Sequence, residues 1–142
     1  MLRIVLDTAV VATALRSRSG AGNAVLQRVA NRRVVPLATT TLVLEYEAVL
    51  KRPEQRVVTG LTIQEIEQFM AELAALCEPV EVHFRWRPQT RDPADEMVLE
   101  AAVNGKSDAI VTYNVRDLSA AAKRFGIPVL LPRDMLKEDP DE

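Results

Sequence analysis

Short apolar runs alternate along the chain with longer segments whose apolar residues recur every three or four positions. The first pattern is typical of buried parallel strands, and the second is typical of helices that cover a sheet. The expected strands are residues 3–6, 34–38, 80–84, 109–112 and 128–131. The expected helices are residues 23–28, 42–52, 63–77, 93–105 and 118–125. The alternation predicts an α/β fold on a mostly parallel sheet, with Pro36 favouring an edge position for its strand.

Several helix boundaries are marked by capping signals. Thr62 and Glu65 form a capping box, which predicts that a helix starts directly after Thr62. Asp92 followed by Pro93 is typical of an N-cap with proline at the first helical position. Pro53 is expected to end the helix over residues 42–52.

The composition fits one compact domain. The chain has 142 residues, of which 48% are hydrophobic, enough for a sizeable core over residues 1–142. Residues 134–142 are expected to be a frayed acidic tail. A single cysteine, Cys77, fits the reducing cytoplasm. The apolar stretch near the start contains Asp7 and is too short to span a membrane, so we expect no membrane partner.

Charge is unevenly distributed. The formal net charge is −2, which by itself does not favour binding to nucleic acid. Residues 8–44, however, contain five arginines and no acid, whereas residues 134–142 contain five acids and one lysine. Without that acidic segment the remainder carries +2, because −2 less −4 is +2. The basic part of the chain is therefore compatible with a nucleic-acid partner.

Several common chemistries are excluded by the residue inventory. His83 is the single histidine, so a histidine pair for acid–base cleavage of RNA is absent. A phosphate-binding loop ending at Gly105-Lys-Ser107 lacks its first glycine, since Glu100 stands at that position. One histidine and one cysteine cannot supply a zinc site of the usual composition. Oxygen ligands are left as the candidates.

Carboxylate and amide oxygens follow the expected strands. Asp7 follows the first strand, Asn114 follows the strand over residues 109–112, and Asp117 comes one helical turn later. Asp92 and Asp95 open the helix before that strand. Ligands of parallel sheets bind at the carboxyl ends of strands, and carboxylates held together there bind hard cations such as Mg²⁺ or Mn²⁺. Such a site permits phosphoryl chemistry.

Four motifs together resemble a PIN-domain ribonuclease of the kind found as the toxin of toxin–antitoxin pairs. They are Leu6-Asp7-Thr8, the segment from Leu42 to Pro53, Arg91-Asp92-Pro-Ala-Asp95 and the segment from Ser107 to Leu118. The resemblance implies a three-layer α/β/α sandwich and Mg²⁺- or Mn²⁺-dependent cleavage of single-stranded RNA. It also implies a homodimer and a cognate antitoxin protein as partner.

The resemblance assigns roles to individual residues. Asp7, Glu45 and Asp95 match the family's metal-binding acids, and Asn114 stands where many members have a fourth aspartate. These four residues are the expected catalytic set and metal ligands, with Asp117 as a further ligand. Thr112 and Asp92 are expected to support them, although Asp92 is most simply an N-cap. Asp117 is equally well explained as part of a cap for a short helix.

Basic residues are candidates for an RNA-binding rim. The candidates are Arg16, Arg18, Arg85, Arg87, Arg91 and Arg116, with Trp86 available for base stacking. A charged run of this kind is also compatible with an ordinary solvated face.

Two alternative functions stay open. A catalytically weakened PIN-like module that binds RNA or protein is suggested by the neutral Asn114 and by Ala9, where the family usually has asparagine. A haloacid-dehalogenase-like phosphatase also has an aspartate after its first strand, but it needs a second acid where this chain has Ala9.

Overall fold

The computed structural model describes residues 1–84, 90 and 92–138. Its strands are β1 (Leu2–Leu6), β2 (Val34–Ala38), β3 (Glu78–Pro79), β4 (Ala109–Val111) and β5 (Val129–Leu130). Its helices are α1 (Thr8–Arg16), α2 (Ala21–Ala30), α3 (Thr40–Leu50), α4 (Pro53–Thr59), α5 (Ile63–Leu76), α6 (Pro93–Gly105), α7 (Val115–Ala122), the short 3₁₀ helix η1 (Lys123–Phe125) and α8 (Pro132–Glu138).

The described strands form a five-stranded sheet in the order β3-β2-β1-β4-β5, and every neighbouring pair is parallel. The chain runs outward from β1 through β2 to β3, then returns to the other side of β1 to form β4 and β5. The strand order therefore reverses between β1 and β4. In an open parallel sheet a reversal of this kind leaves a crevice at the carboxyl ends of the two central strands.

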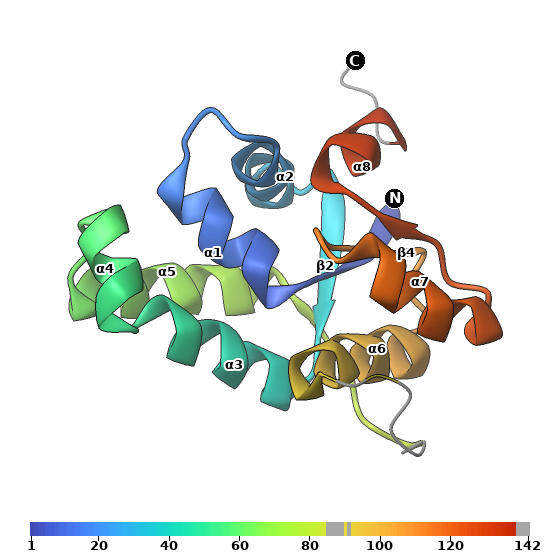
Figure 1. The fold of residues 1–142 in the computed structure, drawn as a ribbon. Helices are drawn as coiled ribbons and strands as arrows, with labels where there is room; N and C mark the ends of the chain where they lie inside the picture. Colours follow the sequence, from blue (N-terminus) through green and yellow to red (C-terminus); the bar gives the residue numbers. More distant parts are fainter. Residues whose placement is uncertain (85–89, 91, 139–142) are drawn as a thin grey trace.

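Helices cover both faces of the sheet. α6 packs on β1, β2 and β4, and α7 packs on β5. Figure 1 shows α1, α4 and α5 on one side of β2 and α7 on the other, while α6 lies across the lower end of β2 beside α3. The predicted three-layer α/β/α sandwich on a parallel sheet is confirmed.

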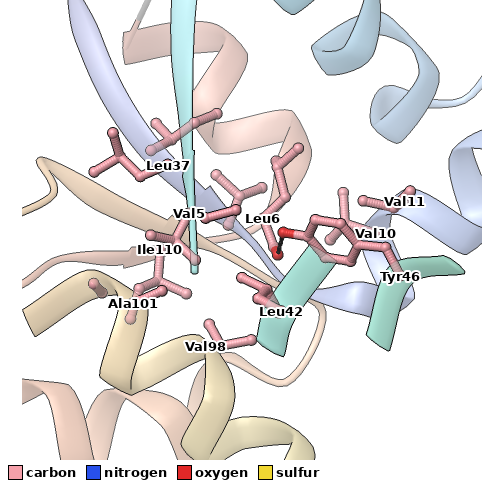
Figure 2. Close-up of a cluster of buried hydrophobic side chains, with 14 of the residues drawn as sticks. Val5, Leu6, Val10, Val11, Leu37, Leu42, Tyr46, Val98, Ala101 and Ile110 are labelled. Carbon is pink, nitrogen blue, oxygen red and sulfur yellow. Dashed lines mark hydrogen bonds between the residues drawn. The ribbon is translucent and has the colours of Figure 1, made fainter. Parts of the chain in front are cut away.

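The core lies between the central strands and the helices around them. The last three residues of β1, Ile4 to Leu6, are at most 1% exposed. Figure 2 shows side chains of β1 and β4 meeting Leu42 of α3 and Val98 of α6. The buried Tyr46 of α3 donates a hydrogen bond from its hydroxyl to the Leu6 carbonyl oxygen at 2.5 Å. This bond holds α3 against the end of β1, one residue before Asp7.

Capping signals in the sequence located two helix starts correctly. The Thr62 side chain accepts a hydrogen bond from the Glu65 backbone N–H, and the Glu65 side chain accepts one from the Thr62 N–H. The Asp92 side chain accepts a hydrogen bond from the Ala94 N–H, and Pro93 occupies the first turn of α6. Both caps satisfy donors that a helix leaves unpaired at its N-terminus.

The strand expected over residues 80–84 is wrong. The structure forms the shorter β3 at Glu78–Pro79, which pairs with the end of β2. The Val80 N–H donates the last bond of this series to the Ala38 carbonyl, and Thr39 then caps α3. Because β2 ends there, residues 81–84 have no strand to pair with.

Two prolines, Pro53 and Pro36, have structural roles that differ from the expected ones. Pro53 was expected only to end a helix over residues 42–52, but α3 ends at Leu50 and Pro53 begins the additional helix α4. Proline is favoured in a first turn because that turn needs no N–H bond. Pro36 was expected at an edge, but β2 lies between β1 and β3. β3 pairs only with Leu37 and Ala38, so Pro36 lies outside that ladder.

Three further elements differ from the expectation. The pattern predicted no helix over residues 8–16, where α1 forms with five of its nine residues buried. The helix expected from residue 118 begins earlier, at Val115. Residues 134–138 are not a frayed tail, because α8 packs on α2 with Met135 fully buried. The last four residues of the expected tail lie outside the described residues.

Candidate functional site

The site lies where the strand order reverses. Asp7 follows β1, and Thr112 and Asn114 follow β4. The backbone N–H of Asp7 donates to the Val111 carbonyl at 2.9 Å, which continues the pairing of the two strands. Because parallel strands in register end at the same edge, residues separated by more than a hundred positions in the sequence become neighbours.

Asp7 is buried and held by a hydroxyl. Its side chain is 7% exposed, and its Oδ2 accepts a hydrogen bond from Thr112 Oγ1 at 2.6 Å. Burial raises the pKa of Asp7, whereas the Thr112 hydrogen bond and the backbone N–H groups of Thr8 and Ala9 lower it. Burial is the largest of these effects on the pKa, so the charged form of Asp7 is disfavoured in the fold.

Thr112 connects Asp7 to the start of α7. Its side chain is fully buried, and its hydroxyl proton is donated to Asp7. The same oxygen accepts a hydrogen bond from the Asn114 backbone N–H at 2.9 Å. The hydroxyl therefore fixes the orientation of the carboxylate and of the chain that carries Asn114.

Asp95 is the second buried carboxylate. It lies in the first turn of α6, is 6% exposed, and its Oδ2 accepts a hydrogen bond from Asn114 Nδ2 at 3.1 Å. Burial, followed by the negative charges of Asp7, Asp92 and Asp117, raises the pKa of Asp95 to about 6, although the Asn114 bond opposes this. Among the described residues, neither Asp7 nor Asp95 has an ion-pair partner.

Asn114 does not cap α7 with its side chain. It occupies the N-cap position, but the structure shows no capping hydrogen bond from the side chain, which instead contacts Asp95. Asp117 lies in the first turn of α7. These contacts link β1, β4, α6 and α7 through one chain of hydrogen bonds: Asp7 to Thr112, Thr112 to the Asn114 backbone, and Asn114 to Asp95.

An open cleft of about 450 Å³ lies beside this chain of contacts. Its lining residues are Thr90, Asp92, Asp95, Asn114, Arg116, Asp117 and Ala120. The cleft combines carboxylates with one arginine, so both a cation and an anionic group could be accommodated side by side. Arg116 is the candidate basic residue that the structure places at the site.

The other sequence candidates lie elsewhere or are not described. Arg16 ends α1 and donates from Nε to Gln55 Oε1 at 2.5 Å, and Arg18 is exposed in the turn before α2. A nine-residue helix is about 12 Å long from first to last residue, so Arg16 lies at the far end of α1 from Asp7. Arg85, Trp86, Arg87 and Arg91 fall outside the described residues.

Glu45 does not join Asp7 and Asp95 in an acidic cluster. Within residues 1–84, 90 and 92–138, no group of three or more histidine, cysteine, aspartate or glutamate side chains is placed to hold a metal ion. Glu45 is half-buried on α3. The expected meeting of Asp7, Glu45 and Asp95 as one metal-holding group is therefore not seen among the described residues. A role for Glu45 as a ligand stays a prediction.

The donors that do meet fit a hard divalent cation in their chemistry. Asp7, Asp95, Asn114 and Thr112 present only oxygen as potential ligand atoms, which suits Mg²⁺ or Mn²⁺ better than zinc. Two carboxylates with raised pKa values and no cationic partner would be relieved by a positive charge. In addition, the buried Thr8 hydroxyl next to Asp7 has no hydrogen-bond partner in the described part of the chain.

The sequence reasoning missed three residues around the site. They are Thr8 next to Asp7, Thr90 in the lining of the cleft and Tyr113 between Thr112 and Asn114. An exposed aromatic residue between two site residues is a signal that could have been found.

Comparison with protein families places the chain in the PIN domain family. The family profile matches residues 3–116, which include β1, β4, α6 and the whole hydrogen-bonded chain from Asp7 to Asp95. The protein is therefore a PIN domain protein, and this family's fold is of the nuclease type. Comparison with curated proteins and with solved structures gives no significant match. No helix in the described part of the chain is both long enough and apolar enough to cross a bilayer.

Proposed function

We propose that this protein is a metal-dependent endoribonuclease that cleaves phosphodiester bonds of single-stranded RNA. The observation that carries the proposal is the pair of buried carboxylates, Asp7 and Asp95, which have no ion-pair partner among the described residues and lie at the reversal point of a PIN domain sheet. Burying negative charge without a partner costs free energy. A fold that maintains such a site is best explained by a ligand that supplies the positive charge.

Each residue has a distinct task in this proposal. Asp7, Asp95 and Asn114 would hold Mg²⁺ or Mn²⁺, with Glu45 and Asp117 as further candidate ligands. When bound, a divalent ion lowers the pKa of a water molecule and neutralises charge on the phosphate. Thr112 holds the Asp7 carboxylate in one orientation. Arg116 supplies a positive side chain in the cleft, where it can bind a phosphate of the RNA backbone.

The products are expected to carry a 5′-phosphate and a 3′-hydroxyl, as the family resemblance implies. No protein nucleophile is required, because the attacking group is water. The PIN family match replaces the haloacid-dehalogenase-like alternative, which would also have required an acid at the position of Ala9.

Cleavage of a labelled single-stranded RNA in the presence of Mn²⁺ tests the proposal. We expect activity that EDTA removes and that Asp7→Asn abolishes. The exposed Glu72→Gln on α5 is the matched control, because it also neutralises one carboxylate but leaves the site intact. Cleavage that survives both EDTA and Asp7→Asn would contradict the mechanism.

A weakened or silent module is the second candidate. It is favoured by the neutral Asn114 and by the lack of a three-acid cluster among the described residues. Calorimetric titration with Mn²⁺ distinguishes the two, since a silent module should show hardly any binding. Asn114→Asp supplies the fourth carboxylate; if only this variant binds Mn²⁺ and cleaves RNA, the natural protein is the silent form.

The biological setting proposed here is that of a cytoplasmic toxin with a cognate antitoxin, acting as a homodimer. The support is the family resemblance of the four sequence motifs. Expression in a bacterial host should arrest growth, and Asp7→Asn should relieve the arrest if RNA cleavage is the cause. Coexpression with a small protein encoded by a neighbouring reading frame should also relieve it, and light scattering measures the oligomeric state.

A further inference from the structure

Tyr113 lies between the two residues that organise the site. The preceding side chain, Thr112, is bonded to Asp7, and the following side chain, Asn114, is bonded to Asp95. Tyr113 itself takes no part in this chain of contacts and is 45% exposed. The structure therefore presents a partly exposed aromatic residue between two residues whose side chains contact the buried carboxylates.

The hydroxyl end of Tyr113 is fixed against α2. A Cβ atom added at Gly22 would lie 3.2 Å from Tyr113 Oη and 3.3 Å from the Val10 carbonyl oxygen. The absence of a side chain at Gly22 thus leaves room for the tyrosine to rest against the first turn of α2. One end of Tyr113 therefore lies close to α2 while nearly half of the residue stays accessible to solvent.

Tyr113 lies outside the acidic cleft and flanks it. Asn114 and Arg116 line the cleft, and Tyr113 does not. The surface beside Asp7 and Asp95 thus offers two different contacts: a guanidinium for a phosphate on one side of Asn114, and an aromatic face on the other. This combination of a positive group with a stacking surface is how single-stranded nucleic acid is bound without base-specific hydrogen bonds.

The other exposed aromatic residue in the described part of the chain is not placed in this way. Phe84 is 62% exposed, but its backbone N–H and carbonyl contact the Asn104 side chain near the end of α6. Asp95 is in the first turn of α6, so about 14 Å of helix separates the two levels. Phe84 therefore serves as a matched control for an exposed ring away from the carboxylates.

We propose that Tyr113 is a substrate-binding residue whose ring stacks on one base of single-stranded RNA beside the bond to be cleaved. This inference rests on the proposed ribonuclease function and adds a contact for the substrate. Because every base has an aromatic face, the contact gives affinity and position with little sequence preference. It would also offset the repulsion between the RNA phosphates and the carboxylates of the site.

Binding of an RNA of about ten nucleotides, measured by fluorescence anisotropy in EDTA, tests the ring directly. Tyr113→Phe keeps the ring and should bind within about twofold of the natural protein, whereas Tyr113→Leu should bind about 5- to 100-fold more weakly. Phe84→Leu should leave affinity unchanged. Thermal unfolding of each variant shows whether loss of binding has a structural origin.

A series of RNAs, each lacking the base at one position, separates stacking from a general packing role. If Tyr113 stacks on a particular base, removing that base should weaken binding to the natural protein and leave binding to Tyr113→Leu unchanged. In cleavage assays Tyr113→Leu should raise KM with little change in kcat. Equal weakening of the intact and base-free RNAs, or unchanged affinity in Tyr113→Leu, would overturn the inference.

The same experiment distinguishes the two proposals. Ring-dependent RNA binding without cleavage would remove the nuclease function and retain the stacking contact. Asp7-dependent cleavage with a fully active Tyr113→Leu would retain the nuclease and remove the contact. A natural protein that does not bind RNA at all would overturn both.

Discussion

The two ends of the β1–β4 strand pair use carboxylates in opposite ways. At the amino ends, Asp108 accepts a hydrogen bond from the Arg3 backbone N–H at 2.8 Å, and the Arg3 side chain forms a salt bridge with Glu78. At the carboxyl ends, Asp7 and Asp95 are buried with no ion-pair partner among the described residues. The first arrangement pairs its charges within the fold, and the second shows no such pair among the described residues.

The charged residues at the two ends of the strand pair also differ in solvent exposure and in the effect on their pKa values. The side chains of Arg3 and Glu78 are 33% and 44% exposed, and the Glu78 contact raises the pKa of Arg3, which favours its charged form. Asp95, by contrast, has its pKa raised to about 6 by burial and by neighbouring acids, which disfavours its charged form. A carboxylate that the fold makes costly to ionise marks a functional site better than a carboxylate in a salt bridge.

The largest expected effect comes from removing charge at the carboxyl ends. Asp95→Asn keeps the size of the side chain and an oxygen that can accept the Asn114 hydrogen bond, but it removes the negative charge. RNA cleavage in saturating Mn²⁺ should fall by more than about 100-fold. A variant with activity within tenfold of the natural protein would show that Asp95 is not part of the catalytic set.

The next effect concerns the hydroxyl that orients Asp7. Thr112→Val removes the bond to Asp7 and leaves the Asn114 N–H without its acceptor, so activity should fall by about 10- to 100-fold. Thr112→Ser keeps the hydroxyl and should recover most of the loss. Equal activity of the valine and serine variants would show that orientation of Asp7 by this hydroxyl is unimportant.

Asp95→Asn should raise the stability of the protein although it lowers the activity. The pKa of Asp95 is higher in the folded protein than in the unfolded chain, so its ionisation opposes folding. The free energy of unfolding should therefore fall as pH rises from about 4 to about 6. Above pH 6 the whole cost is present, and Asp95→Asn should then be more stable by about 1–3 kcal/mol in EDTA.

Urea unfolding at several pH values measures this difference. At pH 4 the two proteins should have nearly equal free energies of unfolding, because Asp95 is then largely protonated in the folded state. Glu72→Gln, which changes an exposed carboxylate, should not reproduce the trend. A natural protein that is more stable than Asp95→Asn at pH 7 would contradict the assignment of strain to this site.

The smallest expected effect lies at the amino ends of the strands. Arg3→Met removes the salt bridge to Glu78 and the hydrogen bonds to the Gly105 and Lys106 carbonyls. Because these contacts are partly exposed, the loss of stability should be about 1 kcal/mol, with RNA cleavage unchanged. A large loss of activity in this folded variant would remove the distinction between the two ends of the strands.

Local sequence rules predicted the parts of the fold that depend on neighbouring residues. The capping box at Thr62 and the Asp92-Pro93 start of α6 are confirmed because both depend on backbone donors within one helical turn. The same rules failed for residues 80–84 and for α1. A strand needs a partner strand, so residues 80–84 cannot be judged from local sequence alone.

The sequence predicted which residues form the candidate site better than it predicted how they are arranged in space. The structure joins Asp7, Thr112, Asn114 and Asp95 through hydrogen bonds, but Asp7, Glu45 and Asp95 do not form one metal-holding group among the described residues. Where a side chain of α3 lies relative to the sheet depends on the tilt and rotation of that helix. The hydrogen bond from Tyr46 to β1 is one of the contacts that set them. Periodicity locates a residue around its own helix and does not fix the orientation of that helix relative to the sheet.

By itself, the sequence determined the fold class and the chemistry that is available: alternating strands and helices, a single cysteine and histidine, and oxygen donors after two strands. The tertiary structure alone decided that β1 and β4 are neighbours and that Asp7 and Asp95 are buried without an ion-pair partner among the described residues. It also decided that Tyr113 rests on Gly22 with its other side exposed. The physical reason is that strand order, burial and the field between charges arise from contacts between residues far apart in the chain.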